Sequence, residues 1–278
     1  MMKPPALPGV SHYERLLGSS EGAISKFSDE PPYFMESPMP TLSRILSSAV
    51  EKLLFHPVTI SGVEAVGESF RLVTMQGVGF QSVKWIPGQT VQIFLGNLTK
   101  RAYTPMSLDA DAGVACFLFY LHGKGPGSGW AASARAGNIC PVMRPKDSID
   151  FTNFTEPALF FGDETSLASA QALHLCRRQT GIARYVFEVN SPAQAEVVLR
   201  NFGVSHTSLV QKREDGSHLA DVVLLMAEQA ARMQSPQWVF TGQARSIQSV
   251  QKGLKQAGIS LFGSKVKAHW SPGKTGLD

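Results

Sequence analysis

One feature constrains the fold of this 278-residue chain most strongly: the period of its hydrophobic residues changes near residue 156. Before that point, apolar runs of strand length are separated by turns that contain glycine. Closely spaced strands joined by such turns predict a small antiparallel barrel or sandwich. The expected strands cover residues 58–66, 69–75, 90–95 and 114–121, and a short helix is expected to start at Ser128.

After residue 156, short apolar strands alternate with longer amphipathic segments, which predicts a parallel sheet covered by helices. The expected strands are 158–161, 185–189, 238–241 and 265–270, and the expected helices are 164–178, 217–233 and 244–257.

The chain is therefore predicted to contain three parts. Residues 1–55 form an arm that ends in an amphipathic helix, which Thr41 caps and which stops before Pro57. Residues 56–152 form the antiparallel β-barrel domain. Residues 153–278 form a smaller α/β domain of nucleotide-binding type.

Charge and cysteine usage exclude several classes of protein. The chain has 26 Lys and Arg against 22 Asp and Glu, a net charge of +4, which favours anionic ligands only weakly and argues against a dedicated nucleic-acid binder. The three cysteines are far apart, so neither a cysteine metal site nor a disulfide framework is expected. No signal-peptide core and no run long enough to cross a bilayer is seen, so we expect a cytoplasmic protein without membrane insertion.

The first candidate site is the segment Arg101-Ala102-Tyr103-Thr104-Pro105. An arginine presents a planar fork of donors that suits a pyrophosphate. In an extended segment the tyrosine two residues later lies on the same side, where its ring can stack on a flat heterocycle. Thr104 adds a hydroxyl that can donate to a ring nitrogen. The structural alternative is an edge strand with a surface arginine and a packed tyrosine.

The second candidate site is the loop from His122 to Trp130, which connects a strand to a helix. Its glycines permit close backbone approach, and the N–H groups at the helix start form an anion site. The alternative is a flexible turn in which Ser128 is a simple N-cap. The residues concerned are His122, Gly125, Pro126, Gly127, Ser128 and Trp130.

Two further segments follow strands of the α/β part, where ligands of open α/β sheets bind. The first contains Gly162, Asp163, Glu164 and Thr165, and the second contains Gly242, Gln243 and Arg245. The alternatives are acidic residues that complement a helix dipole and an ordinary strand–helix turn.

Taken in order, these motifs resemble the FAD-dependent siderophore-interacting proteins of the ferredoxin-reductase superfamily. The resemblance covers roughly residues 56–274. It rests on the RxYT segment, on the GPGSGWA run from Gly125, on the GDETSLA run from Gly162, and on His269-Trp270. The chain departs from the family pattern at Met106, Asn138 and Gln243.

The resemblance implies a β-barrel that binds FAD, followed by an α/β domain that faces the electron donor. Arg101 would contact the pyrophosphate of FAD, Tyr103 would stack on the isoalloxazine ring, and Thr104 would bond near its N5 edge. The backbone of the Gly125–Trp130 loop would bind the diphosphate. Gly162–Thr165 would lie where FAD faces NAD(P)H.

The implied function is reduction of ferric iron in a siderophore or other chelate, with electrons from NAD(P)H or from a ferredoxin, and no protein acid or base is required. Lys265, Lys267 and Lys274 are the predicted docking residues for an anionic ferric chelate; the alternative is that they only solubilise an edge strand. Two other functions stay open: a general flavin reductase for another acceptor, and a non-catalytic module that binds a chelate or nucleotide.

Overall fold

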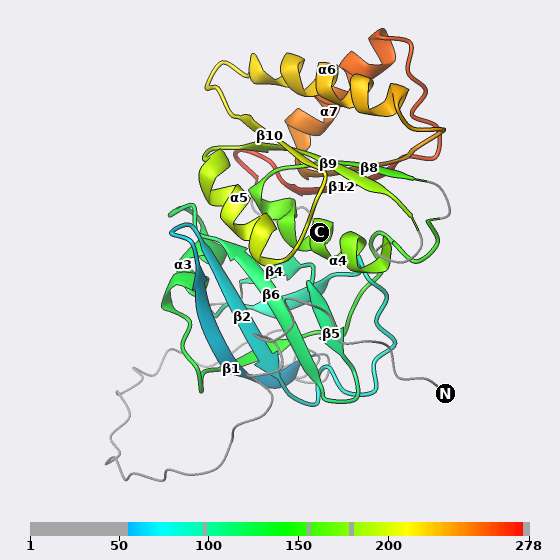
Figure 1. Cartoon of the computed structure of the whole chain (residues 1–278). Helices are drawn as coiled ribbons and strands as arrows, with labels where there is room; N and C mark the ends of the chain where they lie inside the picture. Colours follow the sequence, from blue (N-terminus) through cyan, green and yellow to red (C-terminus); the bar gives the residue numbers. More distant parts are fainter. Residues whose placement is uncertain (1–54, 97–98, 155–156, 178–180, 275–278) are drawn as a thin grey trace, which may run out of the picture. The chain divides into compact units, whose positions relative to one another are not determined.

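The fold was analysed in a computed structural model, which describes residues 55–96, 99–154, 157–177 and 181–274. The predicted arm and amphipathic helix lie outside the described residues. Residues 55–278 form one unit, and Figure 1 shows its two sheets.

The first sheet is antiparallel, of barrel type, and holds seven strands in the order β4-β3-β7-β1-β2-β6-β5. The strands are β1 (His56–Val66), β2 (Phe70–Gln76), β3 (Val91–Phe94), β4 (Lys100–Tyr103), β5 (Ser107–Asp109), β6 (Val114–Tyr120) and β7 (Ile139–Val142). The sequence predicted β1, β2, β3 and β6. It missed the other three because β4 and β5 carry charged or polar residues where the equally short β3 is mostly apolar, and because β7 contains Pro141.

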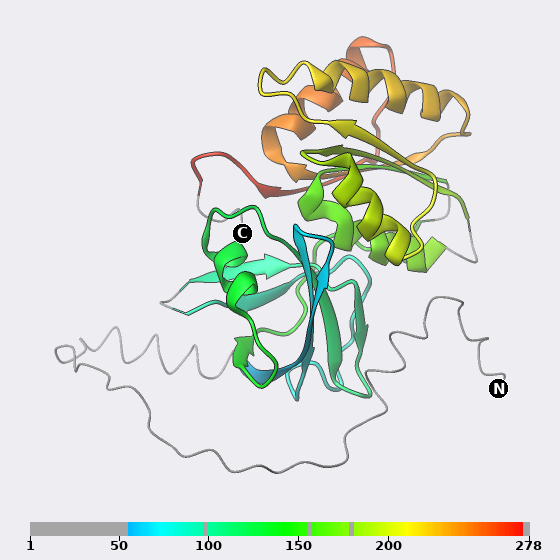
Figure 2. The same cartoon turned by 60° about the vertical axis from the view of Figure 1, so that its left-hand side comes forward.

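The core of this sheet is aromatic and β-branched. Phe117 and Phe119 on β6 are almost fully buried, as are Val73 and Met75 on the neighbouring β2. Helix α3 (Pro126–Ser133) packs on the same core through Ala131, and Figure 2 shows it beside the antiparallel sheet. The helix begins two residues before the predicted Ser128, because a proline at the first helical position has the required φ and lacks only an N–H that would be unpaired there.

The second sheet is parallel, as predicted, with the strand order β10-β9-β8-β11-β12. Its strands are β8 (Ala158–Gly162), β9 (Ala183–Val189), β10 (Thr207–Gln211), β11 (Gln237–Gln243) and β12 (Lys265–Trp270). The sheet lies between two helical layers (Figure 1). One layer holds α4 (Leu167–Arg177) and α5 (Pro192–Asn201), and the other holds α6 (His218–Ala231) and α7 (Ala244–Gln256).

The sequence missed α5 and β10. The apolar stripe of α5 is narrow, with only Ala195, Val198 and Leu199 buried. Its start was nevertheless encoded, since the Ser191 hydroxyl accepts a hydrogen bond from the Gln194 N–H and Pro192 follows at the first helical position. The predicted α/β domain, residues 153–278, is longer than the predicted barrel domain, residues 56–152. The prediction that the α/β domain is the smaller of the two is therefore wrong in residue number.

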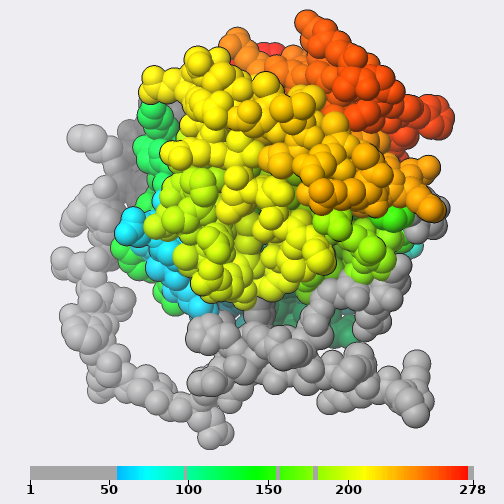
Figure 3. Space-filling view, turned by 45° about the horizontal axis from the view of Figure 1, so that its top comes forward, coloured from blue at the N-terminus to red at the C-terminus, as the bar shows by residue number. Residues whose placement is uncertain are grey.

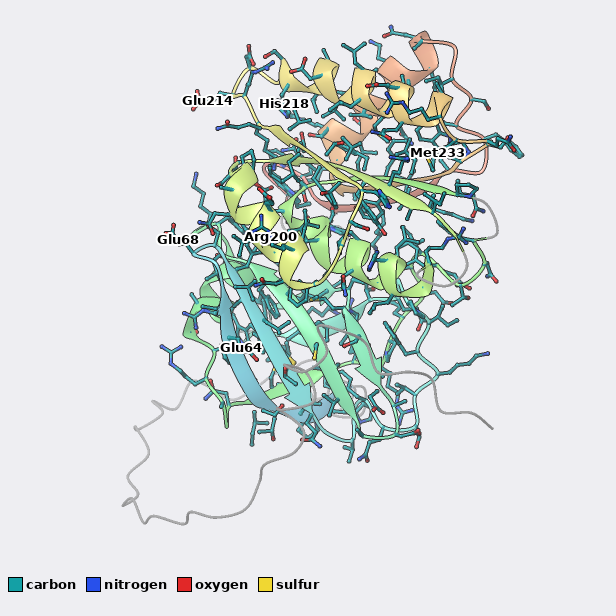
Figure 4. All side chains as sticks on the ribbon, viewed as in Figure 1. Glu64, Glu68, Arg200, Glu214, His218 and Met233 are labelled. Atoms are coloured by element: carbon teal, nitrogen blue, oxygen red, sulfur yellow. The ribbon has the colours of Figure 1, made fainter. Side chains whose placement is uncertain are left out.

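Hydrogen bonds connect the antiparallel sheet and its turns to α4, to α5 and to the segment between β9 and α5. Ser169 on α4 donates to Thr104, and Asn190 donates to the Tyr120 hydroxyl. The Glu68 N–H, in the turn between β1 and β2, donates to Gln194 of α5; Figure 4 marks Glu68 at the tip of this hairpin. The predicted domain boundary at residues 152–153 falls between β7 and β8 and remains a proposal. Across the described part of the chain, the helices are all too short or too polar to span a membrane.

Candidate functional site

Strand β4 carries the first group of predicted residues along an edge of the antiparallel sheet. Arg101 is half-buried there, and its Nη1 donates to the backbone carbonyl of Lys100 at 2.7 Å. No ion pair to a carboxylate is found for Arg101 among the described residues. Ala102 pairs with Gln92 of β3 and so holds the strand in register. The guanidinium therefore keeps donors for an anionic ligand.

Tyr103 joins β4 to helix α3. Its ring packs against Phe119 with centroids 4.5 Å apart, and its hydroxyl lies against Gly127, where an added Cβ would overlap the hydroxyl oxygen. Burial raises the pKa of Tyr103 to about 12, so the phenol stays neutral at physiological pH. The glycine is thus needed for the close approach of β4 and α3.

The loop before α3 leaves the helix N-terminus open. The N-cap is Gly125, with φ at 82°, and no side chain caps the helix. Ser128 is not the cap: its hydroxyl accepts from the Gly123 N–H at 3.1 Å and shapes the loop from inside. The first N–H groups of α3 have no side-chain partner, and such groups favour an anion.

His122 and Trp130 flank this loop. The Nδ1 of His122 accepts from the Lys124 N–H at 3.3 Å, so neutral His122 carries its proton on Nε2. Desolvation lowers the pKa of His122, although Glu164 acts in the opposite direction. Trp130 packs on Phe119 with centroids 5.3 Å apart. The two aromatic side chains of the motifs, Tyr103 and Trp130, therefore share one buried support.

These contacts test whether the residues suit FAD. A dinucleotide diphosphate needs available donors: Arg101 uses Nη1 for the Lys100 carbonyl and keeps its other N–H groups, and no side chain caps the α3 N-terminus. The contact between Tyr103 and Gly127 holds the two donors on neighbouring elements. The donor set fits the cofactor that the sequence predicts.

A second polar centre lies at the carboxyl ends of the parallel strands, where Asp163 is fully buried. Its carboxylate accepts from the Thr165 N–H at 2.9 Å, from the Thr165 hydroxyl at 2.5 Å and from Trp270 Nε1 at 2.7 Å. Asp163 is the N-cap of the 3₁₀ turn η1 (Glu164–Ser166), with a reciprocal bond from its own N–H to the Ser166 hydroxyl. The prediction that its charge complements a helix start is only part of its role.

A bulge in β12 brings two successive side chains to this centre. Ala268 lies opposite Gly242 and Trp270 lies opposite Gln243, so His269 is an extra residue in the pairing with β11. Without the bulge, His269 and Trp270 would point to opposite faces of the sheet. Instead, His269 Nδ1 lies 3.1 Å from the Thr165 hydroxyl, while Trp270 bonds to Asp163.

The proton positions in this chain of contacts follow from chemistry. The Thr165 hydroxyl donates to Asp163, so His269 Nδ1 must be the donor to Thr165. Burial lowers the pKa of His269, with Asp163 raising it and Lys267 lowering it further. His269 is therefore neutral at pH 7, with its proton on Nδ1.

Glu164 forms hydrogen bonds with residues that directly follow β9 and β10. Its carboxylate accepts from the Asn190 N–H at 2.5 Å and from Lys212 Nζ at 2.6 Å. A second buried pair lies nearby: His218 Nδ1 accepts from a backbone N–H, so its Nε2 donates to Glu188 at 2.8 Å. Burial raises the pKa of Glu188. Figure 4 marks His218 at the start of α6.

Sequence reasoning missed these partners. Asn190, Lys212, Glu188 and His218 all lie at or just beyond the carboxyl ends of β9 and β10 or at the start of α6. Their position after strands was the available signal, but β10 itself was not predicted.

The predicted residues after β11 belong to the same centre. Gly242 has φ at 98°, and a Cβ there would meet the Asp163 carboxyl carbon at 2.7 Å, so only glycine allows this approach. Gln243 accepts a hydrogen bond from the Ser246 hydroxyl at 2.8 Å, and Arg245 is exposed at the start of α7. Gly162 is required in the same way, because a Cβ there would overlap Ser166.

The three predicted docking lysines do not form one cluster at this centre. Lys265 is exposed at the opposite end of β12, Lys267 is half-buried in its middle, and Lys274 is exposed beyond its end. Two hollows in the described surface also lie elsewhere. One of about 520 Å³ is lined by α7 side chains, and one of about 240 Å³ is lined partly by Lys265 and Gln237. Figure 3 shows α7 and the loop after it in orange on the surface.

Comparison with known proteins bears on these residues directly. Residues 96–149 match the siderophore-interacting FAD-binding domain family. No curated protein gives a significant match. The matched span contains the Arg101–Thr104 segment and the whole of α3, so the family resemblance and the FAD prediction are confirmed.

Three solved structures share the fold. A siderophore utilization protein from T. fusca is 17% identical, with a TM-score of 0.60, over 81% of this chain and 95% of that one. The siderophore-interacting protein SipS from Aeromonas hydrophila is 14% identical, with a TM-score of 0.63, over 80% and 93%. The FAD/NAD binding domain of nitric oxide dioxygenase from Vibrio cholerae is 12% identical, with a TM-score of 0.60, over 79% and 100%.

These structural similarities show the fold, a barrel-type sheet followed by an α/β region, as predicted. The match to an FAD-binding family supports a flavin-dependent redox function.

Proposed function

We propose that this protein is an FAD-dependent oxidoreductase that reduces ferric iron held in a siderophore or other chelate. The electrons would come from NAD(P)H or from a ferredoxin. One observation carries the proposal. Inside the segment that matches a siderophore-interacting FAD-binding domain, the Arg101 fork, which forms no ion pair with a described carboxylate, and the uncapped N-terminus of α3 lie on elements that Tyr103 and Gly127 hold together.

In this proposal the chain's own residues bind and orient the flavin. Arg101 and the first N–H groups of α3 hold the diphosphate, Tyr103 supplies an aromatic face, and Thr104 supplies a hydroxyl. Bound FAD accepts two electrons together and passes them on singly, which matches a hydride donor to a one-electron ferric acceptor. Fe(III) is held tightly by hard oxygen ligands, so its reduction releases the metal.

In this proposal the Asp163 centre lies where the electron donor, NAD(P)H, approaches the flavin. Its carboxylate and that of Glu164 are already saturated by Thr165, Trp270 and Lys212, so they do not compete for a ligand cation. Their role is to hold the turn after β8 and the end of β12 in one shape. Gly242, Gln243 and Arg245 would then meet the incoming nicotinamide.

The test begins with the flavin. The purified protein should show flavin absorption in the visible spectrum, and chromatography of the released cofactor should give FAD. Anaerobic addition of NADH or NADPH should bleach the spectrum, and a ferric chelate should then restore it with formation of Fe(II). Recovery of FMN alone would contradict the cofactor assignment. Reoxidation by a quinone or dye but not by ferric chelates would favour a general flavin reductase.

We keep Lys265, Lys267 and Lys274 as residues whose charge attracts an anionic ferric chelate, although they do not form one binding cluster. Replacement of all three by glutamine should slow the reduction of an anionic chelate, most strongly at low ionic strength, because salt screens exposed charges. FAD content should not change. An unchanged rate in low salt would remove this assignment, and Lys100 and Lys124 beside the flavin motifs would be the next residues to test.

A further inference from the structure

A pair of buried hydroxyls connects helix α4 to the residue that follows strand β4 at the predicted flavin site. Ser169 on α4 donates to the Thr104 hydroxyl oxygen at 3.1 Å. Ser169 is 4% exposed and Thr104 is 9% exposed, so water does not readily satisfy either group. The two residues are 65 positions apart in the sequence.

The direction of this hydrogen bond is unusual for a helical serine. Serines inside helices commonly donate to a carbonyl one turn earlier in their own helix. Ser169 instead donates out of α4 to another side chain. A buried hydroxyl without a partner is costly, so this bond holds the serine rotamer and the helix against Thr104.

The bond also determines what Thr104 can do. A hydroxyl group has one proton to donate and two lone pairs to accept with. Ser169 occupies one lone pair, and no acceptor for the Thr104 proton is found among the residues that the structure describes. Thr104 directly follows Arg101–Tyr103, so a buried donor without a protein acceptor lies beside the flavin-binding strand.

We propose that Ser169 is a positioning residue that holds Thr104 as a hydrogen-bond donor to the flavin and thereby favours the oxidised form of the cofactor. This inference rests on the proposed function. Hydrogen bonds in a chain polarise one another, so donation by Ser169 strengthens the donation by Thr104. A ring nitrogen accepts this bond only in oxidised flavin, because reduction places a hydrogen on it.

The measurement is the reduction potential of the bound flavin, obtained by titration of the FAD-loaded protein against a reference dye. Ser169→Ala should raise the potential, and Ser169→Thr, which keeps the hydroxyl, should restore it toward the parent value. The dissociation constant for FAD should rise by no more than about tenfold, the loss expected for one neutral hydrogen bond. The control is Ser208→Ala on β10, an edge strand of the parallel sheet that carries no proposed flavin-binding residue. This change should leave the potential unchanged.

A double-mutant cycle separates positioning from a structural effect. Thr104→Val should raise the potential at least as much as Ser169→Ala, and the two changes together should shift it no further than Thr104→Val alone. If Ser169→Ala left the potential unchanged, or if its shift persisted in the Thr104→Val background, the inference would be wrong. If Ser169→Ala did not fold, an unchanged potential in Thr104→Val would overturn it.

The outcomes distinguish this inference from the proposed function. A parent protein that binds no flavin overturns both. A parent that binds FAD and shows the Ser169 shift, but does not reduce ferric chelates, supports the inference and removes the ferric acceptor from the proposed function.

Discussion

The two polar centres of this molecule handle their charged groups in opposite ways. At the edge of the antiparallel sheet, Arg101 and the N-terminus of α3 are donors that lack charged partners among the described residues. At the ends of the parallel strands, Asp163 and Glu164 are saturated by side chains and N–H groups of the same chain.

This difference indicates that the Arg101 and α3 centre binds a ligand, whereas the Asp163 and Glu164 centre stabilises the local structure. Open donors cost little while they face water, and they gain when an anion arrives. A buried carboxylate without partners would be costly, so Asp163 must be satisfied before any ligand binds. We therefore expect substitutions at the first centre to change cofactor affinity, and substitutions at the second to change stability.

The sharpest test of the second centre is Asp163→Ala. It removes the acceptor of the Trp270 N–H and of the Thr165 N–H and hydroxyl, three hydrogen bonds made by one fully buried carboxylate, so the free energy of unfolding should fall by about 3 kcal/mol. Urea denaturation followed by circular dichroism measures it. Asp109→Ala is the control, because the Asp109 carboxylate likewise accepts more than one hydrogen bond, in its case two from backbone N–H groups, but is exposed. Equal losses in the two variants would contradict the account.

Arg101→Ala tests the first centre. The loss of one charge-assisted contact should weaken FAD binding about tenfold to a hundredfold, with little change in unfolding. Arg101→Lys keeps the charge but loses the planar fork, so its affinity should be intermediate. Tyr103→Phe keeps the ring and should retain the flavin. Fluorescence titration of the apoprotein with FAD gives these affinities, and parental affinity in Arg101→Ala would refute the assignment.

A pair of glycines in α3 tests the link between β4 and the helix. Gly127→Ala places a methyl group on the Tyr103 hydroxyl, so it should destabilise the protein by about 1–3 kcal/mol and weaken FAD binding. Gly129→Ala has open space around the new Cβ and should be neutral or stabilise by about 1 kcal/mol. Thermal unfolding of both variants measures the contrast. Similar melting temperatures would show that the close contact is not needed.

The smallest expected effect is the pH dependence that His269 adds. Burial lowers its pKa in the folded state, whereas in the unfolded chain it titrates near 6.5. Below about pH 6.5 the unfolded chain therefore binds a proton at His269 that the folded protein does not bind. The free energy of unfolding falls as the pH drops. The slope should approach at most about 1.4 kcal/mol per pH unit. His269→Gln should reduce this slope between pH 7.5 and 5.5 in urea unfolding; an unchanged slope would show that His269 does not titrate as described.

Much of the fold was readable from local patterns. The change of period near residue 156 predicted the two kinds of sheet, because strand alternation and helix periodicity are properties of short segments. The RxYT and GDET motifs are local in the sequence, so their residues could be selected as candidates without the structure. The strands β4, β5 and β7 lack the apolar run that marks the equally short β3, and α5 buries too narrow a stripe.

The sequence alone determined which groups are available: an arginine two residues before a tyrosine, a glycine-rich helix start, and two acids after a buried strand. Only the tertiary structure decided how they are paired. The bulge that turns both His269 and Trp270 toward the turn η1 depends on the pairing of β12 with β11. The bond from Ser169 to Thr104 depends on α4 lying against the antiparallel sheet. Such contacts join residues far apart along the chain, so no local pattern of hydrophobicity or charge can encode them.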